Sequence, residues 1–281
     1  MLTYVVESMR PRQWYKNLLL FAGIVFSKHL SDLALLGKVS AGFLLFCLLS
    51  SSLYLLNDIC DRRLDALHPK KKHRPIAQGV LPVSYALIFS VLFASVSLLS
   101  SYFLGIYFFF SALFYLVVMV LYSRVLKSIE IIDVIIIGVG FVLRAIAGCF
   151  IVGVLISPWL ILCTFLLALF LAFGKRRHEL LSDRTHRQTL AHYSESLLDH
   201  FLSITSASII LSYSLYTFIS QRNLALMLTI PFVVFGVFRF FYLIYSRDEV
   251  SANTELIFKD RAMIANLLLW GVSVIFILYL F

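Results

Sequence analysis

Charged side chains are scarce in this chain: they make up 14% of its 281 residues, whereas hydrophobic residues make up 61%. So little charge excludes a water-soluble domain of this size. Cysteine is also scarce, and the four cysteines have no pair spacing typical of a zinc site, so neither a disulfide framework nor a metal knuckle is expected. The N-terminus shows no early apolar region with a small-residue cleavage site, so we expect no cleaved signal peptide.

Long apolar segments dominate what remains, and a membrane-spanning helix needs about 20 predominantly apolar residues. The sequence therefore predicts an all-α polytopic membrane protein with about nine transmembrane helices. Lys28, His29 and Asp32 interrupt the first segment, and a short or partly re-entrant first helix would reduce the clean spans to eight. The expected spans are 17–36, 37–56, 83–103, 106–122, 132–153, 157–173, 200–219, 224–245 and 262–280.

The basic residues predict the orientation of these spans, because cytoplasmic loops carry an excess of Lys and Arg. With the N-terminus inside, most of the 24 basic residues fall on the cytoplasmic side; only Lys28, Lys38 and Arg222 fall outside. We therefore expect a multi-pass protein of the plasma membrane, in bacteria the inner membrane, with its active site facing the cytoplasm. The basic run at 70–74 follows from this topology and from anionic lipid headgroups, so the bilayer is an expected partner and nucleic acid is not.

Three carboxylates gather where the apolar run ending at Leu56 stops. On a helix, Asp58, Asp61 and Asp65 project from one face within an arc of roughly 60°. Crowded carboxylates repel one another unless a cation lies among them, and Mg²⁺ prefers one or two carboxylates together with the phosphates of a substrate. The spacing predicts a magnesium–diphosphate site at the wet end of the helix. A solvated helix end with pairs such as Asp58 and Arg62 is the alternative.

A second polar cluster follows the sixth expected span. Arg176, Glu179 and Asp183 share one helical face, and Lys175 lies close to it. Both clusters end an even-numbered span and open a long cytoplasmic loop, which predicts two four-helix halves around a central cavity opening to the cytoplasm. An ordinary basic flank with ion pairs inside the helix is the alternative.

Arg144 lies deep in the fifth expected span, about 16 Å beyond Asp133 on the same face. Gly140, Ala147 and Gly148 lie near this face, which indicates that it faces other helices. An arginine near mid-membrane costs at least about 2.5 kcal/mol and by default indicates a functional site. We expect Arg144 to reach toward an anionic group or to stabilise the inner wall of the cavity. Pairing with a neighbouring helix is the alternative.

The chain resembles the UbiA-type membrane prenyltransferase superfamily, through Asn57-Asp58-x-x-Asp61-x-x-x-Asp65 and the expected topology. Further motifs resemble its decaprenyl-phosphate phosphoribosyltransferase branch. They are, in order, Arg10-Pro11-Arg12-Gln13-Trp14-x-Lys16-Asn17, Arg74-Pro75-Ile76-Ala77-x-Gly79, Tyr122-Ser123-x-x-Leu126-Lys127, Gly140-Phe141-Val142-Leu143-Arg144-x-x-Ala147-Gly148, Gly174-Lys175-Arg176-x-x-Glu179 and Lys259-Asp260-Arg261.

The resemblance implies that a single domain, 1–281, transfers 5-phosphoribose from phosphoribosyl diphosphate to a polyprenyl phosphate lipid, with Mg²⁺ as cofactor. A basic cluster stands where the aromatic-prenylating members have a second aspartate-rich motif, and this favours a donor with an additional phosphate. Asp58, Asp61 and Asp65 are the expected catalytic residues, and with Asn57 they are the expected metal ligands. Asn57 is also expected to bind substrate, together with Lys16, Arg74, Lys127, Arg144, Lys175, Arg176 and Glu179.

Two other functions are compatible with the sequence. An ordinary prenyltransferase would use the same carboxylates to ionise a polyprenyl diphosphate and alkylate an aromatic or other acceptor. A transporter or flippase would also have many helices, a pseudo-repeat and an intramembrane arginine, although the short, nearly uncharged outer loops offer little to receive a solute. A homo-oligomer is compatible with all three functions.

Overall fold

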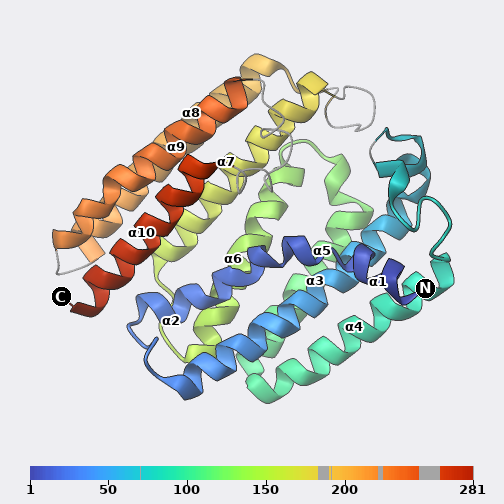
Figure 1. The fold of residues 1–281 in the computed structure, drawn as a ribbon, viewed down its shortest axis with the longest axis horizontal. Helices are drawn as coiled ribbons and strands as arrows, with labels where there is room; N and C mark the ends of the chain where they lie inside the picture. The colour runs from blue at the N-terminus through green and yellow to red at the C-terminus, as the bar shows by residue number, and fades with distance from the viewer. Residues whose placement is uncertain (70, 183–189, 191, 221–223, 247–259, 281) are drawn as a thin grey trace. The chain divides into compact units, whose positions relative to one another are not determined.

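Apolar helices account for most of the chain, as the sequence predicts. The structure is a computed structural model that describes residues 1–69, 71–182, 190, 192–220, 224–246 and 260–280, and no strand occurs among them. The chain divides into two compact units, Met1–Ile156 and Ser157–Phe281. Each unit contains four long helices (Figure 1), in agreement with two four-helix halves.

Unit 1 begins with short helices and continues with four long ones. Its elements are α1 (Leu2–Met9), the 3₁₀ helix η1 (Pro11–Phe21), α2 (Ala22–Phe26), α3 (Leu33–Leu67), η2 (Lys71–His73), α4 (Val83–Leu104), α5 (Ile106–Arg124), η3 (Leu126–Ser128) and α6 (Ile132–Val152). Unit 2 contains α7 (Pro158–Ser182), α8 (Glu195–Leu215), the π-helical turn η5 (Tyr216–Ser220), η6 (Leu224–Thr229), α9 (Ile230–Tyr245) and α10 (Arg261–Leu280).

Within the described ranges, eight helices are long and apolar enough to cross a membrane, which is the count that the sequence allows if the first helix is short. The difference from nine is the span expected at 17–36, which is η1 and α2 followed by a turn. Lys28 in that turn has a left-handed backbone with φ 61°. The Asp32 side chain then accepts hydrogen bonds from the backbone N–H groups of Ala34 and Leu35, at 2.9 and 3.0 Å, and so caps the start of α3. The polar residues of this segment therefore end one helix and begin the next.

Two helices continue beyond the apolar segments that predict them. The second expected span ends at Leu56, whereas α3 continues to Leu67 and carries the aspartate motif on its last turns. The sixth expected span ends at residue 173, whereas α7 continues to Ser182 and carries Lys175 to Glu179. Both polar clusters therefore lie on helices, so the face-sharing argument from the sequence applies to them.

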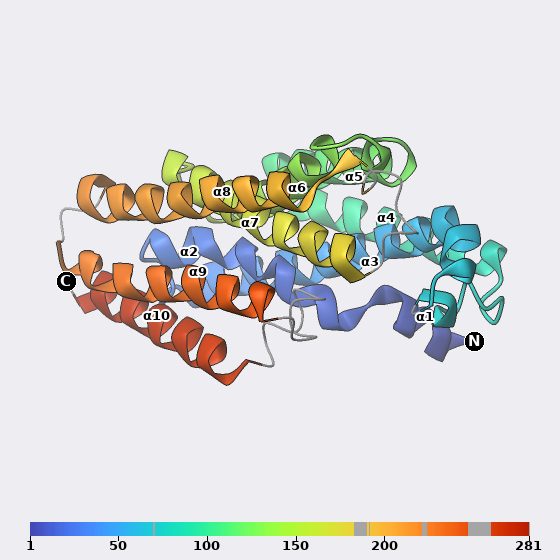
Figure 2. The same cartoon turned by 90° about the horizontal axis from the view of Figure 1, so that it is seen from above.

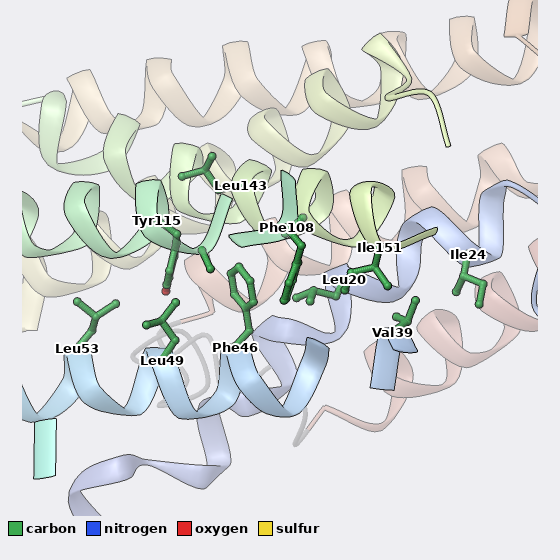
Figure 3. Packing of buried hydrophobic residues seen from close by; sticks show 12 residues of the cluster. Leu20, Ile24, Val39, Phe46, Leu49, Leu53, Phe108, Tyr115, Leu143 and Ile151 are labelled. Carbon is green, nitrogen blue, oxygen red and sulfur yellow. The ribbon is translucent and has the colours of Figure 1, made fainter. Parts of the chain in front are cut away.

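The core of unit 1 lies between α3 and the two helices α5 and α6. Figure 3 shows Phe46 of α3 pointing toward Phe108 and Tyr115 of α5, with ring centroids 5.6 and 5.4 Å away. Leu143 and Ile151 of α6 belong to the same buried cluster. This packing fixes the position of α3, and therefore of the aspartates at its end.

Small residues let the first segment approach α6 closely. A Cβ atom at Gly148 would collide with the backbone carbonyl of Leu20 in η1. A Cβ atom at Gly23 in α2 would lie 3.0 Å from the backbone of Cys149. The sequence predicts close packing on this face of α6, and the structure identifies η1 and α2 as the segments that pack there.

Aromatic rings hold unit 2 together. Phe170 of α7 packs against Phe240 and Phe241 of α9, with ring centroids 4.8 and 5.4 Å away. α7 also runs beside α8, as Figures 1 and 2 both show. A buried hydroxyl pair, Tyr213 and Thr229, at 2.7 Å, joins α8 to η6. These contacts position the polar residues at the end of α7.

We expect Gly148→Ala to lower the free energy of unfolding by about 1–3 kcal/mol, because the added methyl group must displace the backbone of η1. The matched control is Gly271→Ala in α10, where nothing described lies within 4 Å of the added Cβ. Alanine is the better helix former, so the control should be neutral or stabilising. Thermal unfolding in detergent measures both variants, and equal Tm values for the two would contradict this packing.

Candidate functional site

The aspartate motif lies on the last turns of α3, and two of its carboxylates are buried. Asp58 and Asp65 are only 2% and 3% exposed, whereas Asp61 is half-buried. The wet helix end expected from the sequence is therefore wrong for Asp58 and Asp65, because segments from other parts of unit 1 cover them. Buried carboxylates need compensating charge, since removing a charge from water costs several kcal/mol.

Three basic side chains supply that charge. Arg10 forms an ion pair with Asp58, and Lys127 forms one with Asp61. Arg74 bridges two carboxylates, because its Nη1 lies 3.1 Å from Asp58 Oδ1 and 2.6 Å from Asp65 Oδ2. The alternative from the sequence, pairs within the helix such as Asp58 with Arg62, is not the arrangement described: the partners of Asp58 come from outside α3. Arg74 and Lys127 are two of the substrate-binding residues that the sequence predicts.

Arg10 is the residue at this cluster that the sequence reasoning missed. It joins α1 to η1 with a left-handed backbone, φ 53°, which is uncommon for a residue other than glycine. This turn brings its guanidinium to Asp58 and over the ring of Tyr54, at 5.1 Å. The signal available in the sequence was the Arg10-Pro11 pair, in which proline begins η1.

The carboxylate oxygens of the cluster are suitable ligands for a hard cation such as Mg²⁺. In the described residues these side chains do not surround a single cation position. No group of three His, Cys, Asp or Glu side chains in the described ranges is placed to hold a metal ion. Mg²⁺, however, commonly uses one or two carboxylates and takes its remaining ligands from water and substrate phosphates. The Asn57 side chain donates a hydrogen bond of 3.0 Å from Nδ2 to Asp61 Oδ2, so Asn57 orients a carboxylate of the motif.

Lys16 and Arg144 lie elsewhere in unit 1. Lys16 Nζ lies 2.8 Å from Gln13 Oε1, one turn away in η1. Arg144 is 5% exposed, and its Nε donates to Asn17 Oδ1 at 2.7 Å. The substrate-binding roles predicted for Lys16 and Arg144 stay predictions.

The contacts of Arg144 explain how an arginine is accommodated in the fifth expected span. Its Nη1 donates to the Gly140 carbonyl at 2.8 Å, and its Nη2 donates to the Tyr115 hydroxyl at 2.5 Å. Asn17, which accepts from Arg144, also donates to Ser50 Oγ at 3.2 Å. One buried polar network therefore links η1, α3, α5 and α6. This agrees with the alternative in which Arg144 pairs with neighbouring helices.

The second cluster lies on the last turns of α7 in unit 2. Arg176 is 2% exposed, and its Nη1 donates to Glu179 Oε2 at 2.6 Å. Lys175 Nζ lies 3.8 Å from Glu179 Oε1. The predicted face of Arg176 and Glu179 is thus confirmed, while Asp183 lies outside the described residues. Convergence of this cluster with the aspartates on one cavity stays a prediction.

Arg177 and Asp260 of unit 2 form ion pairs that join helices. Arg177 binds α8, with Nε 2.5 Å from Asp199 Oδ1 and Nη2 2.7 Å from Glu195 Oε1. Asp260 caps α10, and its hydrogen bonds from Arg239 hold the pKa of its carboxyl below the usual value. Arg239 therefore pairs with Asp260 between α9 and α10. Lys259, from the last of the sequence motifs, lies outside the described residues.

Solved structures share this fold. The structure of a UbiA homolog from Archaeoglobus fulgidus bound to GPP and Mg²⁺ matches with a TM-score of 0.75 and 20% identity, covering 99% of this chain and 100% of that one. A digeranylgeranylglyceryl phosphate synthase structure matches with a TM-score of 0.70 and 16% identity, covering 100% and 99%. At these identities the likeness establishes the fold alone.

The family follows from the sequence match: the model of the UbiA prenyltransferase family matches residues 18–278, so the chain belongs to this family. Within this family, the chain is similar to enzymes of one name. The chain is 36% identical to a decaprenyl-phosphate phosphoribosyltransferase of Mycolicibacterium smegmatis over 228 residues, which cover 78% of this chain and 71% of the relative. It is 29% identical to the enzyme of the same name from Corynebacterium glutamicum, with 98% and 87% covered.

Proposed function

We propose that this membrane protein transfers 5-phosphoribose from phosphoribosyl diphosphate to a long-chain polyprenyl phosphate and releases diphosphate. Relatives of this name match most of the chain, and the order of its motifs supports the same branch. The observation that carries the proposal is the basic cluster on α7. By the resemblance, Arg176 and Lys175 occupy the place that holds a second aspartate motif in the aromatic-prenylating members, and two basic residues there suit a donor with one more phosphate.

The aspartates of α3 serve the diphosphate of the donor in this proposal. Asp58, Asp61 and Asp65, with Asn57, would hold Mg²⁺, which neutralises charge on the diphosphate leaving group when bound. Arg74 and Lys127 already lie against these carboxylates, so an arriving phosphate can take over their positive charges without a large movement. Arginine suits this exchange because its guanidinium can bind phosphate through two hydrogen bonds.

The chemistry needs no dedicated general base. A phosphate acceptor is already ionised at neutral pH, so its oxygen can attack C1 of the ribose directly. The new bond forms between that oxygen and C1, and the bond from C1 to the diphosphate breaks. Because C1 develops positive charge, positioning and electrostatic stabilisation should dominate the rate. Lys16, Arg144, Lys175, Arg176 and Glu179 are the remaining candidates for contacting or orienting the phosphates.

We place the reaction at the cytoplasmic face of the plasma membrane, in bacteria the inner membrane. The eight apolar helices of the described chain support a multi-pass membrane protein. The excess of Lys and Arg in the loops supports the cytoplasmic side, where a water-soluble donor is available. A homo-oligomer is compatible with this arrangement.

A second candidate is an ordinary prenyltransferase that uses a polyprenyl diphosphate and an aromatic or other acceptor. A neighbour of the same fold was solved with GPP and Mg²⁺, which favours this candidate. The two candidates share the aspartate site and differ in the donor.

The donor can be tested directly. Purified protein in detergent is given labelled phosphoribosyl diphosphate with polyprenyl phosphate or, in parallel, labelled polyprenyl diphosphate with an aromatic acid. We expect label to enter lipid only from phosphoribosyl diphosphate, and only with Mg²⁺ present. Consumption of polyprenyl diphosphate alone would refute the proposal and leave the family membership intact.

Asp61→Asn should abolish turnover in that assay, because one carboxylate of the site loses its charge. Asp61 is a cleaner test than Asp58, whose burial between two arginines means that its substitution also destabilises the fold, by about 3–5 kcal/mol. Asp32→Asn at the opposite end of α3 is the control, because asparagine also caps helices well. Full activity of Asp61→Asn, or of the wild type in EDTA, would exclude this mechanism.

Arg176→Gln should raise the apparent KM for phosphoribosyl diphosphate about ten- to a hundredfold, because a charge-assisted hydrogen bond to phosphate is lost. Arg177→Gln is the neighbouring control, since Arg177 is bound to Asp199 and Glu195 of α8. The control should lower Tm and leave KM unchanged. An unchanged KM in Arg176→Gln would remove this residue from the donor site.

A further inference from the structure

The short helix α1 has an exposed apolar edge. Leu2 is 69% exposed and Val6 is 47% exposed. The two residues are spaced i, i+4, so they lie next to each other on one edge of the helix. The adjacent edge carries Thr3 and Glu7, which have the same spacing and are also exposed. An apolar edge and a polar edge therefore run side by side along the eight residues of α1.

The opposite side of α1 is packed against the rest of unit 1. Val5 is buried in a cluster with Leu55 of α3 and with Leu81, which lies just before α4. Figure 1 shows α1 beside α3. Glu7 lines a polar pocket next to Asp58. The polar edge of α1 is therefore directed to the aspartate site, and the apolar edge points in a different direction.

The contacts of Val5 show the level of α1 relative to the membrane-spanning helices. Its partner Leu55 is followed by Leu56, where the apolar run of α3 ends, and then by the polar Asn57. Its partner Leu81 precedes the membrane-spanning helix α4 by two residues. α1 is thus level with the point where α3 leaves the hydrocarbon and α4 enters it. Adjacent apolar and polar edges at this level are typical of an interfacial helix, which lies on the membrane surface with its apolar side chains in the bilayer.

The charges at this end of unit 1 suit an anionic lipid surface. Arg12 follows α1 closely and is exposed. Lys71 and Lys72 of η2 are also exposed, and η2 contacts α3. Lysine and arginine near a membrane surface are attracted to anionic headgroups. The apolar edge and the basic residues together therefore fit a bilayer with anionic headgroups.

We propose that α1 is an interfacial helix. Leu2 and Val6 insert into the leaflet on the side of the aspartate motif, and Arg12 contacts the anionic headgroups of that leaflet. The bilayer is the partner that covers the exposed apolar edge. The proposal concerns the protein and its lipids, so it does not depend on the donor or the acceptor of the reaction.

Insertion of α1 also accounts for the backbone of Arg10. Arg10 joins α1 to η1 in a left-handed conformation, with φ 53°. A residue other than glycine keeps such a conformation only when the structure on both sides enforces it. Pro11 begins η1 on one side, and α1 held in the membrane surface restrains the other. The lipid contact therefore helps to hold the guanidinium of Arg10 at Asp58.

Fluorescence quenching tests the insertion in the full-length protein, in nanodiscs of phosphatidylcholine and phosphatidylglycerol. A bimane probe is attached at Leu2→Cys, at Val6→Cys or, as the control on the polar edge, at Thr3→Cys. Each variant also carries Cys60→Ser, because Cys60 is exposed and would be labelled. Lipids with a nitroxide on the acyl chain should quench the probes at positions 2 and 6 more strongly than the probe at position 3. Iodide in the water should show the reverse order.

Equal quenching by nitroxide lipid at all three positions would overturn the proposal. Protection of positions 2 and 6 from both quenchers would also overturn it, because a second copy of the chain or another protein segment would then cover the apolar edge.

Trypsin gives a second readout that needs no probe. The bond after Arg12 is the first cleavable one beyond α1, because proline follows Arg10. Leu2→Asn with Val6→Asn should speed cleavage after Arg12 in nanodiscs about tenfold or more, since two apolar side chains no longer hold α1 in the bilayer. Thr3→Asn is the control and should be cleaved as the wild type is. An unchanged rate in the double variant would refute the insertion of α1.

The headgroup contact is tested separately with the probe at position 2. Arg12→Gln should lower its quenching by nitroxide lipid, because one attraction to anionic headgroups is lost. The control is Lys38→Gln, an exposed lysine near the opposite end of α3, and it should leave the quenching unchanged. Equal quenching in the two variants would exclude Arg12 from the headgroup contact.

Discussion

Unit 1 is organised around the burial of negative charge at the end of α3. Asp58 and Asp65 are removed from solvent, and two carboxylates two turns apart on one helix face are stable there only with cations between them. Arg10 and Arg74 reach these two carboxylates, and Lys127 reaches the neighbouring Asp61, so the three cations come from three different segments of the chain. The charge requirement therefore draws the N-terminal segment and two interhelical connections onto the same end of α3.

Under the proposed function, the same arrangement prepares the end of α3 for an anionic ligand. Each of the three basic side chains is partly exposed, with 22–24% of the side chain accessible. A phosphate can compete with a carboxylate for these cations, because both accept charge-assisted hydrogen bonds of similar strength. The ion pairs of these three basic residues are thus compatible with both a stable fold and phosphate binding, and the side chains would need to move little when a phosphate binds.

Deeper in unit 1, the buried charge of Arg144 is accommodated by hydrogen bonds. Its described hydrogen-bond partners are neutral: the Asn17 amide, the Gly140 carbonyl and the Tyr115 hydroxyl. Such a network needs close helix contact, which Gly148 permits by letting the backbone of η1 approach α6. The small residues and the buried arginine of α6 therefore act together in the packing of α6 against η1. Gly148 permits the close backbone contact with η1, and Arg144 hydrogen-bonds Asn17 of η1.

Periodicity and hydropathy by themselves determined the long helices and the face shared by the three aspartates, and the motifs of the sequence carried the resemblance to the family. They depend only on local sequence, because a span requires a run of apolar residues and a helix fixes which side chains are neighbours. The tertiary structure alone decided that Asp58 and Asp65 are buried, and that Arg10 and Ser8 lie beside Asp58. Those features arise from contacts between segments far apart in the chain, and the spacing of residues within one segment carries no information about such contacts.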